Sequence, residues 1–164
     1  MYTKEKIVKK STKRLIIKII VIAGIVFLVN QFLITLYRMN GNSMFPAIRD
    51  GDLCFLLKTE KPKTDDIVLW KDNEGKKHLS RVIAVSGQTV EFNDTGVVIN
   101  GYPQAESIFY ETVPTDDVSY PLTVDGYFVM NDFRSDVSDS RTYNNIKDNQ
   151  IIGKIFFIFR RRGF

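Results

Sequence analysis

The sequence predicts a mainly β fold, in which a single N-terminal transmembrane helix precedes a coiled antiparallel β-sheet domain. Two observations lead to this expectation. An apolar segment of 23 residues lies near the N-terminus, at residues 15–37. Short β-branched and aromatic runs follow it, separated by turn residues, and no segment of helical length with a period of 3.6 residues stands out after Tyr37. Such a pattern favours an antiparallel β architecture.

The apolar segment, residues 15–37, is long enough to cross a hydrocarbon core of about 30 Å. Lys18 can extend its ammonium to the near interface, whereas Asn30 and Gln31 interrupt the far half. A cleaved signal peptide is the main alternative, but its apolar core spans only about 7–15 residues, and no small-x-small site follows here. A buried helix of a soluble domain is a weaker alternative, because Ile19–Val29 is apolar all round. We therefore expect a retained membrane anchor in contact with lipid.

Charge predicts the orientation of this anchor. Residues 1–14 hold six basic side chains against the single acidic Glu5, and such a basic head stays cytoplasmic. Residues 38–164 are then extracytoplasmic, on the outer side of the cell membrane. That part has 16 basic and 18 acidic side chains, so the net charge of +4 reflects the anchoring head and Lys18. We expect no nucleic-acid partner.

The residues that bind metals or form disulfides are scarce. Cys54 is the only cysteine and His78 the only histidine, which leaves no intrachain disulfide and no plausible zinc site. Cys54 lies in the apolar run DLCFLLK and is expected to be a small core residue. No glycine-rich phosphate loop is present. We expect neither a metal nor a cofactor, and one domain over residues 38–164.

The expected strands are short runs rich in β-branched and aromatic residues. They are Leu53–Leu57, Ile67–Trp70, Leu79–Val85, Thr89–Phe92, Val97–Ile99, Tyr127–Met130 and Ile151–Phe159. Turn residues lie between them, as at Asn73-Glu74-Gly75, Ser86-Gly87 and Asn93-Asp94-Thr95-Gly96. Residues 102–120, rich in polar residues and proline, are expected to form an extended excursion.

One serine stands out in this chain. The run MNGNSMFPAIRDGD, residues 39–52, begins two residues past the apolar segment and puts Ser43 on a Gly-flanked turn. Its place, where the chain would leave a membrane, suggests cleavage of something that is itself in the membrane. Taken alone, an ordinary turn serine would be the commoner interpretation.

Four segments in order resemble the type I signal peptidase family in its Gram-positive form. They are NGNSMFPAIRDGD (40–52), DDIVLWK (65–71), HLSRVIAVSGQTV (78–90) and NDFRSDVSDSR (131–141). The resemblance implies a membrane-anchored, largely β catalytic domain. It also implies removal of signal peptides from exported proteins at the outer surface, with small residues preferred just before the cut.

The resemblance implies a Ser–Lys dyad in which Ser43 is the nucleophile. A serine hydroxyl needs a base to take its proton, and lysine serves only if burial lowers its pKa. The backbone N–H of Ser43 would help to form the oxyanion hole. Gly41, Asn42 and Met44 would support it by shaping the turn and the adjoining wall.

The lysine is missing from this chain. The family places it directly before the arginine that corresponds to Arg81, and that position is Ser80, whose hydroxyl is not a base at neutral pH. The serine that orients the lysine is also absent, since its position is Val137. The resemblance retains Asp139 and Arg141, which we expect to form an ion pair in the wall of the site. The family pattern also has a Gly and an Asn on either side of the Asp that corresponds to Asp132. In this chain these two positions are Asn131 and Phe133.

His78 is the best chemical substitute for the lysine, because its ordinary pKa of about 6.5 suits base catalysis. Its Cα would lie about 7 Å from that of Ser80 along a strand, whereas a hydrogen bond to Ser43 needs about 2.6–3.2 Å. Lys76 would lie about 13 Å away by the same rise. We favour the alternative that His78 is a surface residue at the end of a strand.

Two functional hypotheses follow. In the favoured one, the chain engages signal peptides of exported proteins with an impaired or inactive dyad, and acts as a binding or assembly factor. The resemblance includes degenerate members tied to surface pilus assembly, so pilins are candidate partners. In the alternative, it is an active serine endopeptidase that removes signal peptides with Ser43 and an unusual base.

Overall fold

The computed structural model describes residues 2–93, 96–104, 115 and 118–160. The side chains of residues 2–11, 29 and 30 are not part of this description. Most of the excursion expected over residues 102–120 lies outside the described residues, as do Asp94 and Thr95 of an expected turn. The chain divides into two compact units, Met1–Ile34 and Thr35–Phe164.

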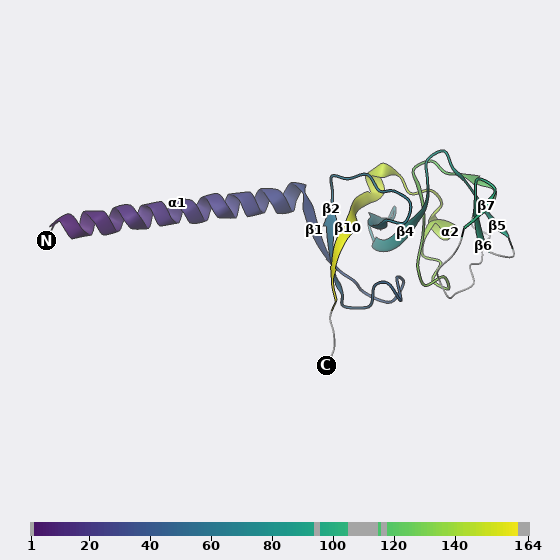
Figure 1. The fold of residues 1–164 in the computed structure, drawn as a ribbon, viewed down its shortest axis with the longest axis horizontal. Coiled ribbons are helices and arrows are strands. Elements are labelled where there is room, and N and C mark those ends of the chain that lie inside the picture. Colours follow the sequence, from purple (N-terminus) through teal and green to yellow (C-terminus); the bar gives the residue numbers. More distant parts are fainter. Residues whose placement is uncertain (1, 94–95, 105–114, 116–117, 161–164) are drawn as a thin grey trace. The chain divides into compact units, whose positions relative to one another are not determined.

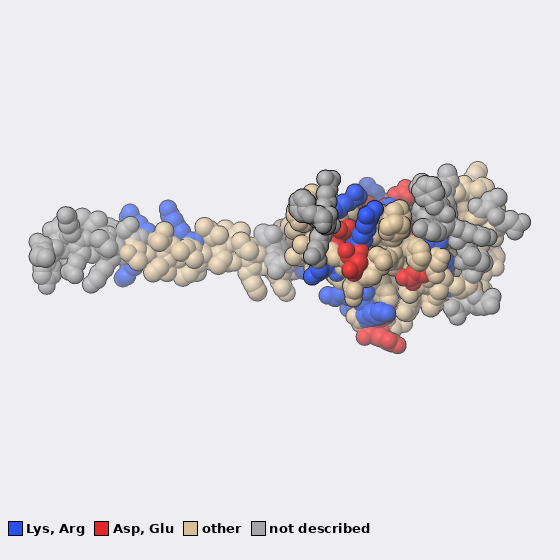
Figure 2. All heavy atoms as spheres, turned by 90° about the horizontal axis from the view of Figure 1, so that it is seen from below, with Lys and Arg blue, Asp and Glu red and all other residues tan. Residues whose placement is uncertain are grey.

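The first unit is the helix α1, Tyr2–Phe32, of 31 residues (Figure 1). Basic side chains near its middle are followed by an uncharged stretch, drawn in tan in Figure 2. Within the described part of the chain, no helix combines the length and the hydropathy that crossing a membrane requires.

The end of α1 differs from the expected range of residues 15–37. The helix stops at Phe32, and Ile34–Arg38 form the strand β1 of the first sheet. This segment contains β-branched and aromatic residues, which favour a strand, and Tyr37 packs against a core cluster of the second unit. Pairing with a sheet therefore takes these residues out of the helix.

The second unit contains two β-sheets and confirms the mainly β, antiparallel prediction. The larger sheet has the strand order β1-β2-β10-β3-β4-β9 and the smaller one the order β7-β6-β5-β8. The pairings β2–β10, β10–β3, β3–β4 and β4–β9 are all antiparallel. The further strands of the larger sheet are β2 Leu53–Leu57, β3 Ile67–Lys71, β4 Lys77–Val85, β9 Tyr127–Met130 and β10 Ile151–Phe159. Those of the smaller are β5 Thr89–Asn93, β6 Gly96–Ile99, β7 Tyr102–Pro103 and β8 Leu122–Thr123.

Two short helical segments complete the unit, α2 Ser140–Tyr143 and the 3-10 helix η1 Asp148–Gln150. The strand β10 follows η1 directly and lies between β2 and β3. Gly153 permits its close approach to β2, because a Cβ at this position would lie 2.7 Å from the carbonyl oxygen of Leu57.

The strands β3 and β4 separate two core clusters, since alternate residues of a strand point to opposite faces. On one face, Leu69 and Leu79 pack with Met44 and Cys54. On the other face, Val68 and Trp70 belong to a second cluster. Cys54 is fully buried, as expected, and burial raises the pKa of its thiol to about 11.

Candidate active site

Residues 39–52, which we call the Ser43 turn, join β1 to β2. Backbone hydrogen bonds close the base of this turn. The Met39 N–H donates to the carbonyl of Asp52 at 2.8 Å, and the Gly51 N–H donates to the carbonyl of Met39 at 2.9 Å. Inside the turn, the Gly41 N–H donates to Asp50 Oδ1 at 2.8 Å. Gly41 has a φ of +86°, a conformation that glycine adopts without the steric cost of a side chain.

Two contacts hold Ser43 in place. The side chain of Met44 is fully buried and packs in the cluster that contains Leu69 and Leu79. The carbonyl of Ser43 accepts a hydrogen bond of 2.9 Å from the N–H of Phe133, in the segment after β9. The turn is thus attached to the sheet and to the segment that carries the fourth family motif.

The hydroxyl and the backbone N–H of Ser43 are not engaged. Among the described residues, neither its hydroxyl nor its backbone N–H makes a hydrogen bond. The N–H is therefore available to an incoming carbonyl, as an oxyanion-hole donor must be. Among the residues that the structure describes, no base makes a hydrogen bond with the Ser43 hydroxyl.

Ser43 lines a pocket of about 160 Å³, which we call the Ser43 pocket. Its lining comes from three parts of the chain: the end of β1 with the turn after it, the start of β4 with the residue before it, and the segment after β9. The lining residues are Tyr37, Met39–Ser43, Lys76–Leu79, Asn131, Asp136 and Ser138.

Ser80 is buried and both its hydrogen-bonding roles are taken. Its Oγ accepts a hydrogen bond of 3.1 Å from Trp70 Nε1 and donates one of 2.8 Å to Asn131 Oδ1. Its relative exposure is 0 %. Ser80, which the resemblance places at the position of the family's lysine, is therefore a hydrogen-bonded core serine, and it does not line the Ser43 pocket.

His78 is not the surface residue that the sequence suggested. It is only 8 % exposed and stacks on Trp70, with ring centroids 4.6 Å apart. Its Nε2 lies 2.9 Å from Asp72 Oδ2. The prediction that His78 is exposed is wrong, because the antiparallel register pairs Trp70 with His78 and the indole covers the imidazole.

Asp72 is a residue that the sequence reasoning missed. The hydrogen bond from His78, followed by those from the backbone N–H groups of Lys76 and Glu74, holds the pKa of this carboxyl below its ordinary value. His78 and Ser43 line the same pocket, yet no hydrogen bond joins them in the described structure. The signal in the sequence was the turn Asn73-Glu74-Gly75, which brings the two ends of the β3–β4 hairpin together.

Two lysines also line the Ser43 pocket. Lys76 and Lys77 are both exposed. The sequence reasoning put Lys76 on the strand, whereas β4 begins at Lys77 and Lys76 belongs to the preceding turn. Among the described residues, no lysine makes a hydrogen bond with the Ser43 hydroxyl.

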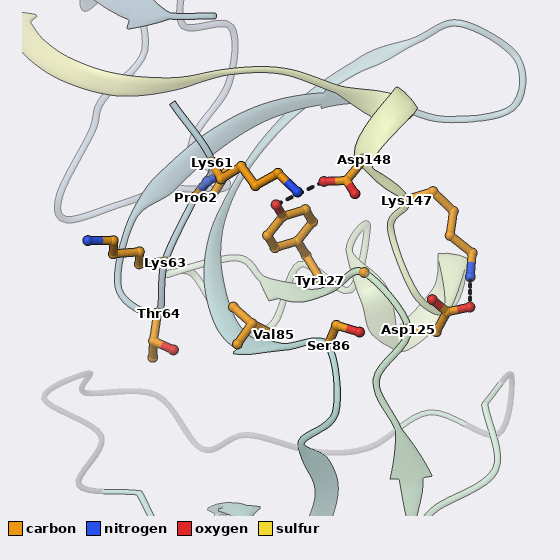
Figure 3. A pocket seen from close by; sticks show the side chains of 11 residues that line it. Lys61, Pro62, Lys63, Thr64, Val85, Ser86, Asp125, Tyr127, Lys147 and Asp148 are labelled. Atoms are coloured by element: carbon orange, nitrogen blue, oxygen red, sulfur yellow. Dashed lines mark hydrogen bonds and ion pairs between the residues drawn. The ribbon is translucent and has the colours of Figure 1, made fainter. Parts of the chain in front are cut away.

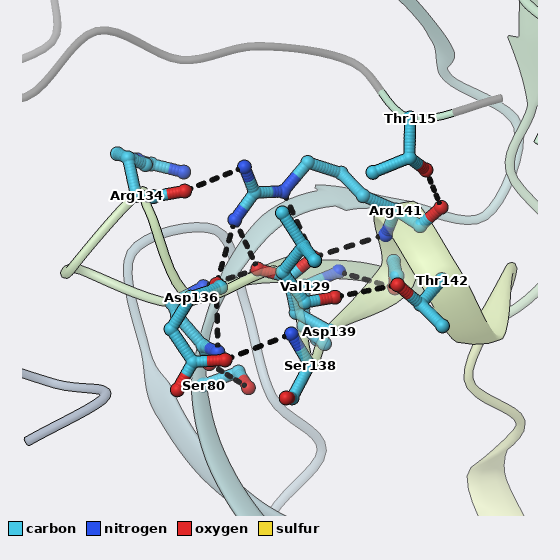
Figure 4. Close-up of polar contacts among 12 residues, drawn as sticks. Ser80, Thr115, Val129, Arg134, Asp136, Ser138, Asp139, Arg141 and Thr142 are labelled. Atoms are coloured by element: carbon cyan, nitrogen blue, oxygen red, sulfur yellow. Dashed lines mark hydrogen bonds and ion pairs between the residues drawn. The ribbon is translucent and has the colours of Figure 1, made fainter. Parts of the chain in front are cut away.

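Asp139 and Arg141 form a fully buried ion pair, as expected (Figure 4), but neither residue lines the Ser43 pocket. Arg141 donates from Nε and Nη2 to the two carboxylate oxygens of Asp139 at 3.0 and 2.8 Å. Its guanidinium also donates to the carbonyls of Arg134 and Asp136. The backbone N–H of Asn131 donates to Asp139 Oδ2 at 2.8 Å, so this pair fixes the end of β9.

A second arginine ties the same segment to β4. Arg81 donates from Nε and Nη2 to the carboxylate of Asp132 at 2.8 and 2.7 Å, and from Nη1 to the carbonyl of Asp65. The hydrogen bonds to Asp132 raise the pKa of the guanidinium. Bidentate pairing of this kind fixes geometry as well as charge.

Val137 lies between these anchored residues and is 38 % exposed. Its carbonyl accepts hydrogen bonds from the Asp139 N–H and the Thr142 hydroxyl, both at 2.7 Å. Its side chain has no hydroxyl that could orient a base. Its neighbours Asp136 and Ser138 line the Ser43 pocket, whereas Val137 does not.

A second pocket of about 430 Å³ contains none of the site residues expected from the sequence (Figure 3). Tyr127 donates to Asp148 Oδ1 at 3.0 Å there, and Lys147 forms an ion pair with Asp125. Burial, with this hydrogen bond, raises the pKa of Tyr127 to about 12. Within the described residues, no cluster of His, Cys, Asp and Glu side chains could hold a metal ion.

Comparison with known proteins agrees with this geometry. The family model for signal peptidase, peptidase S26, matches residues 12–160. The chain is 28 % identical to signal peptidase IB of Staphylococcus aureus, over 92 % of this chain and 91 % of the relative. It is 33 % identical to signal peptidase I T of Bacillus subtilis (strain 168), over 94 % of this chain and 90 % of the relative. The chain therefore belongs to the signal peptidase family S26, which confirms the resemblance.

A solved structure supports the fold. The crystal structure of a signal peptidase I from Enterococcus faecalis V583 matches with a TM-score of 0.50 and 24 % identity. The match covers 59 % of this chain and 98 % of that chain.

Proposed function

We propose that this protein is a signal peptidase homologue that holds signal peptides of exported proteins in the Ser43 pocket and cleaves them slowly or not at all. The observation that carries this proposal is the state of Ser80. Its hydroxyl donates its proton to Asn131 and accepts the Trp70 N–H. A neutral hydroxyl is not a base at neutral pH, so Ser80 takes no proton from Ser43. Without a base, a serine hydroxyl is a weak nucleophile.

The pocket retains what is needed to hold an extended segment. Its lining includes the chain that continues from β1 and the start of β4. The free N–H of Ser43 supplies a donor to a peptide carbonyl. An extended peptide can bind between such segments by main-chain hydrogen bonds. Binding therefore does not depend on the base that the chain lacks.

The proposed role is that of a binding or assembly factor at the outer surface of the cell membrane. Large apolar side chains of α1, from Leu15 to Leu28, are exposed, and burial in lipid would remove them from water. The basic residues before them favour a cytoplasmic N-terminus. Pilins, as partners in surface pilus assembly, follow from the resemblance to degenerate family members.

Binding is tested with the full chain in detergent micelles and a fluorescent peptide that has small residues before its cleavage site. We expect anisotropy to rise with wild type and not with Ser43→Trp, because an indole fills much of a 160 Å³ pocket. Ser135→Trp is the matched control, since Ser135 is exposed and outside the pocket. Equal binding by wild type and Ser43→Trp would contradict the proposal.

The membrane placement has its own test. We expect the chain to remain in the membrane fraction after carbonate extraction, and a protease added outside to digest the second unit. Recovery in the carbonate supernatant would refute the anchor.

A second candidate function rests on His78. Ser43 and His78 line one pocket, and Asp72 holds the imidazole, which is the arrangement of a Ser–His–Asp set in outline. In this alternative, the chain is an active serine endopeptidase. It predicts cleavage that is lost in both Ser43→Ala and His78→Ala.

A further inference from the structure

Asn131 follows β9 directly and lies between Ser80 and the Ser43 pocket. It is 1 % exposed, and its backbone is fixed by the N–H donated to Asp139. From the sequence it was only one of two changed positions beside Asp132. Its hydrogen bonds give it a more specific role.

The orientation of the Asn131 carboxamide follows from the chemistry of its neighbours. An indole N–H can only donate, so Ser80 Oγ must accept from Trp70. The Asp136 carbonyl can only accept, so the amide nitrogen of Asn131 faces it and donates at 3.1 Å. The amide oxygen is then presented to the Ser80 hydroxyl, which donates to it at 2.8 Å.

These bonds use half of the carboxamide. An asparagine side chain has two N–H donors and an oxygen with two lone pairs, and Asp136 and Ser80 take one of each. Buried polar groups usually find partners. Since Asn131 lines the Ser43 pocket, one N–H and one lone pair remain for whatever occupies that pocket.

We propose that Asn131 is a binding residue of the Ser43 pocket, whose carboxamide pairs with the backbone C=O and N–H of one residue in an extended polypeptide. The remaining N–H donates to the carbonyl of that residue, and the remaining lone pair can accept its N–H. Ser80 and Asp136 act as positioning residues that hold the amide plane. Asn131, which contacts Ser80, is thus part of the proposed peptide-binding site. This inference rests on the proposed binding function.

The test is a double-mutant cycle between Asn131 and the peptide backbone. A parent peptide with small residues before its cleavage site is compared with ester analogues that replace one amide at a time. The full chain in micelles is used, as wild type and as Asn131→Ala. We expect Asn131→Ala to bind the parent peptide about three- to tenfold more weakly, the effect of one hydrogen bond. At one ester position, wild type should lose affinity by about the same factor, and Asn131→Ala less than about twofold.

Two further measurements keep the outcome clear. Asn131→Asp keeps the acceptor for Ser80 but has no N–H, so it should bind as weakly as Asn131→Ala, and circular dichroism checks that both variants fold. If wild type binds the parent peptide and Asn131→Ala binds it equally, or if no ester position shows the coupling, this proposal is overturned while the binding function stands. If wild type does not bind the peptide, the binding function fails and this proposal with it.

Discussion

The buried pair of Asp139 and Arg141 gives the sharpest prediction about stability. Both side chains are 0 % exposed, and the guanidinium donates to two carboxylate oxygens and two carbonyls. Arg141→Met keeps much of the apolar stem but leaves the Asp139 carboxylate buried without its countercharge. Breaking a buried pair in this way costs about 3–5 kcal/mol. For a chain of this size, that corresponds to a fall in Tm of about 6–20 °C.

The assay is urea unfolding of the full chain in micelles, followed by circular dichroism, with a thermal scan alongside. Lys147→Met is the matched control, because it removes a lysine from an exposed ion pair with Asp125, and such pairs contribute up to about 1 kcal/mol. Arg141→Met with Asp139→Leu should be less destabilising than the sum of the single changes, since no charge is left buried. A loss below about 1 kcal/mol for Arg141→Met would refute the reasoning.

Three further predictions concern single side chains. The His78 hydrogen bond lowers the pKa of Asp72, so the stability from that carboxylate is present above its unfolded pKa and is lost as pH falls through the folded value. The Tm gap between wild type and Asp72→Asn should therefore shrink below about pH 4; a constant gap down to pH 2 would contradict this. Cys54, with its pKa raised to about 11, should resist DTNB at pH 8 until guanidinium unfolds the chain; rapid labelling of the native chain would show that the thiol is accessible. Gly153→Ala should cost about 1–3 kcal/mol in urea unfolding, because its Cβ meets Leu57; an unchanged midpoint would mean that the strands separate easily.

The strands of the second unit could be predicted from the sequence because their composition and turns are local signals. The end of α1 could not, since Ile34–Arg38 continue an apolar run and become a strand only by pairing with a sheet. Tertiary context decides such a segment, and local propensity does not.

The site was partly predictable for a similar reason. Ser43, Asp139 and Arg141 lie in motifs that the sequence displays directly. The burial of His78 depends on its cross-strand neighbour Trp70, and its partner Asp72 depends on the register of the hairpin. The contact of Ser80 with Asn131 joins residues 51 positions apart, which no local pattern reveals.

The most direct test of the claim that Ser43 lacks a base is a cleavage assay with protein and peptide in equal amounts. Wild type and Ser43→Ala, both shown to bind the peptide, are incubated with it in micelles, and mass spectrometry measures product and any acyl group on Ser43. A Ser43 without a base predicts no accumulated acyl-enzyme, and little or no more product from wild type than from Ser43→Ala. Conversion of most of the peptide by wild type and not by Ser43→Ala, with acylated Ser43, would contradict this account and establish an active peptidase.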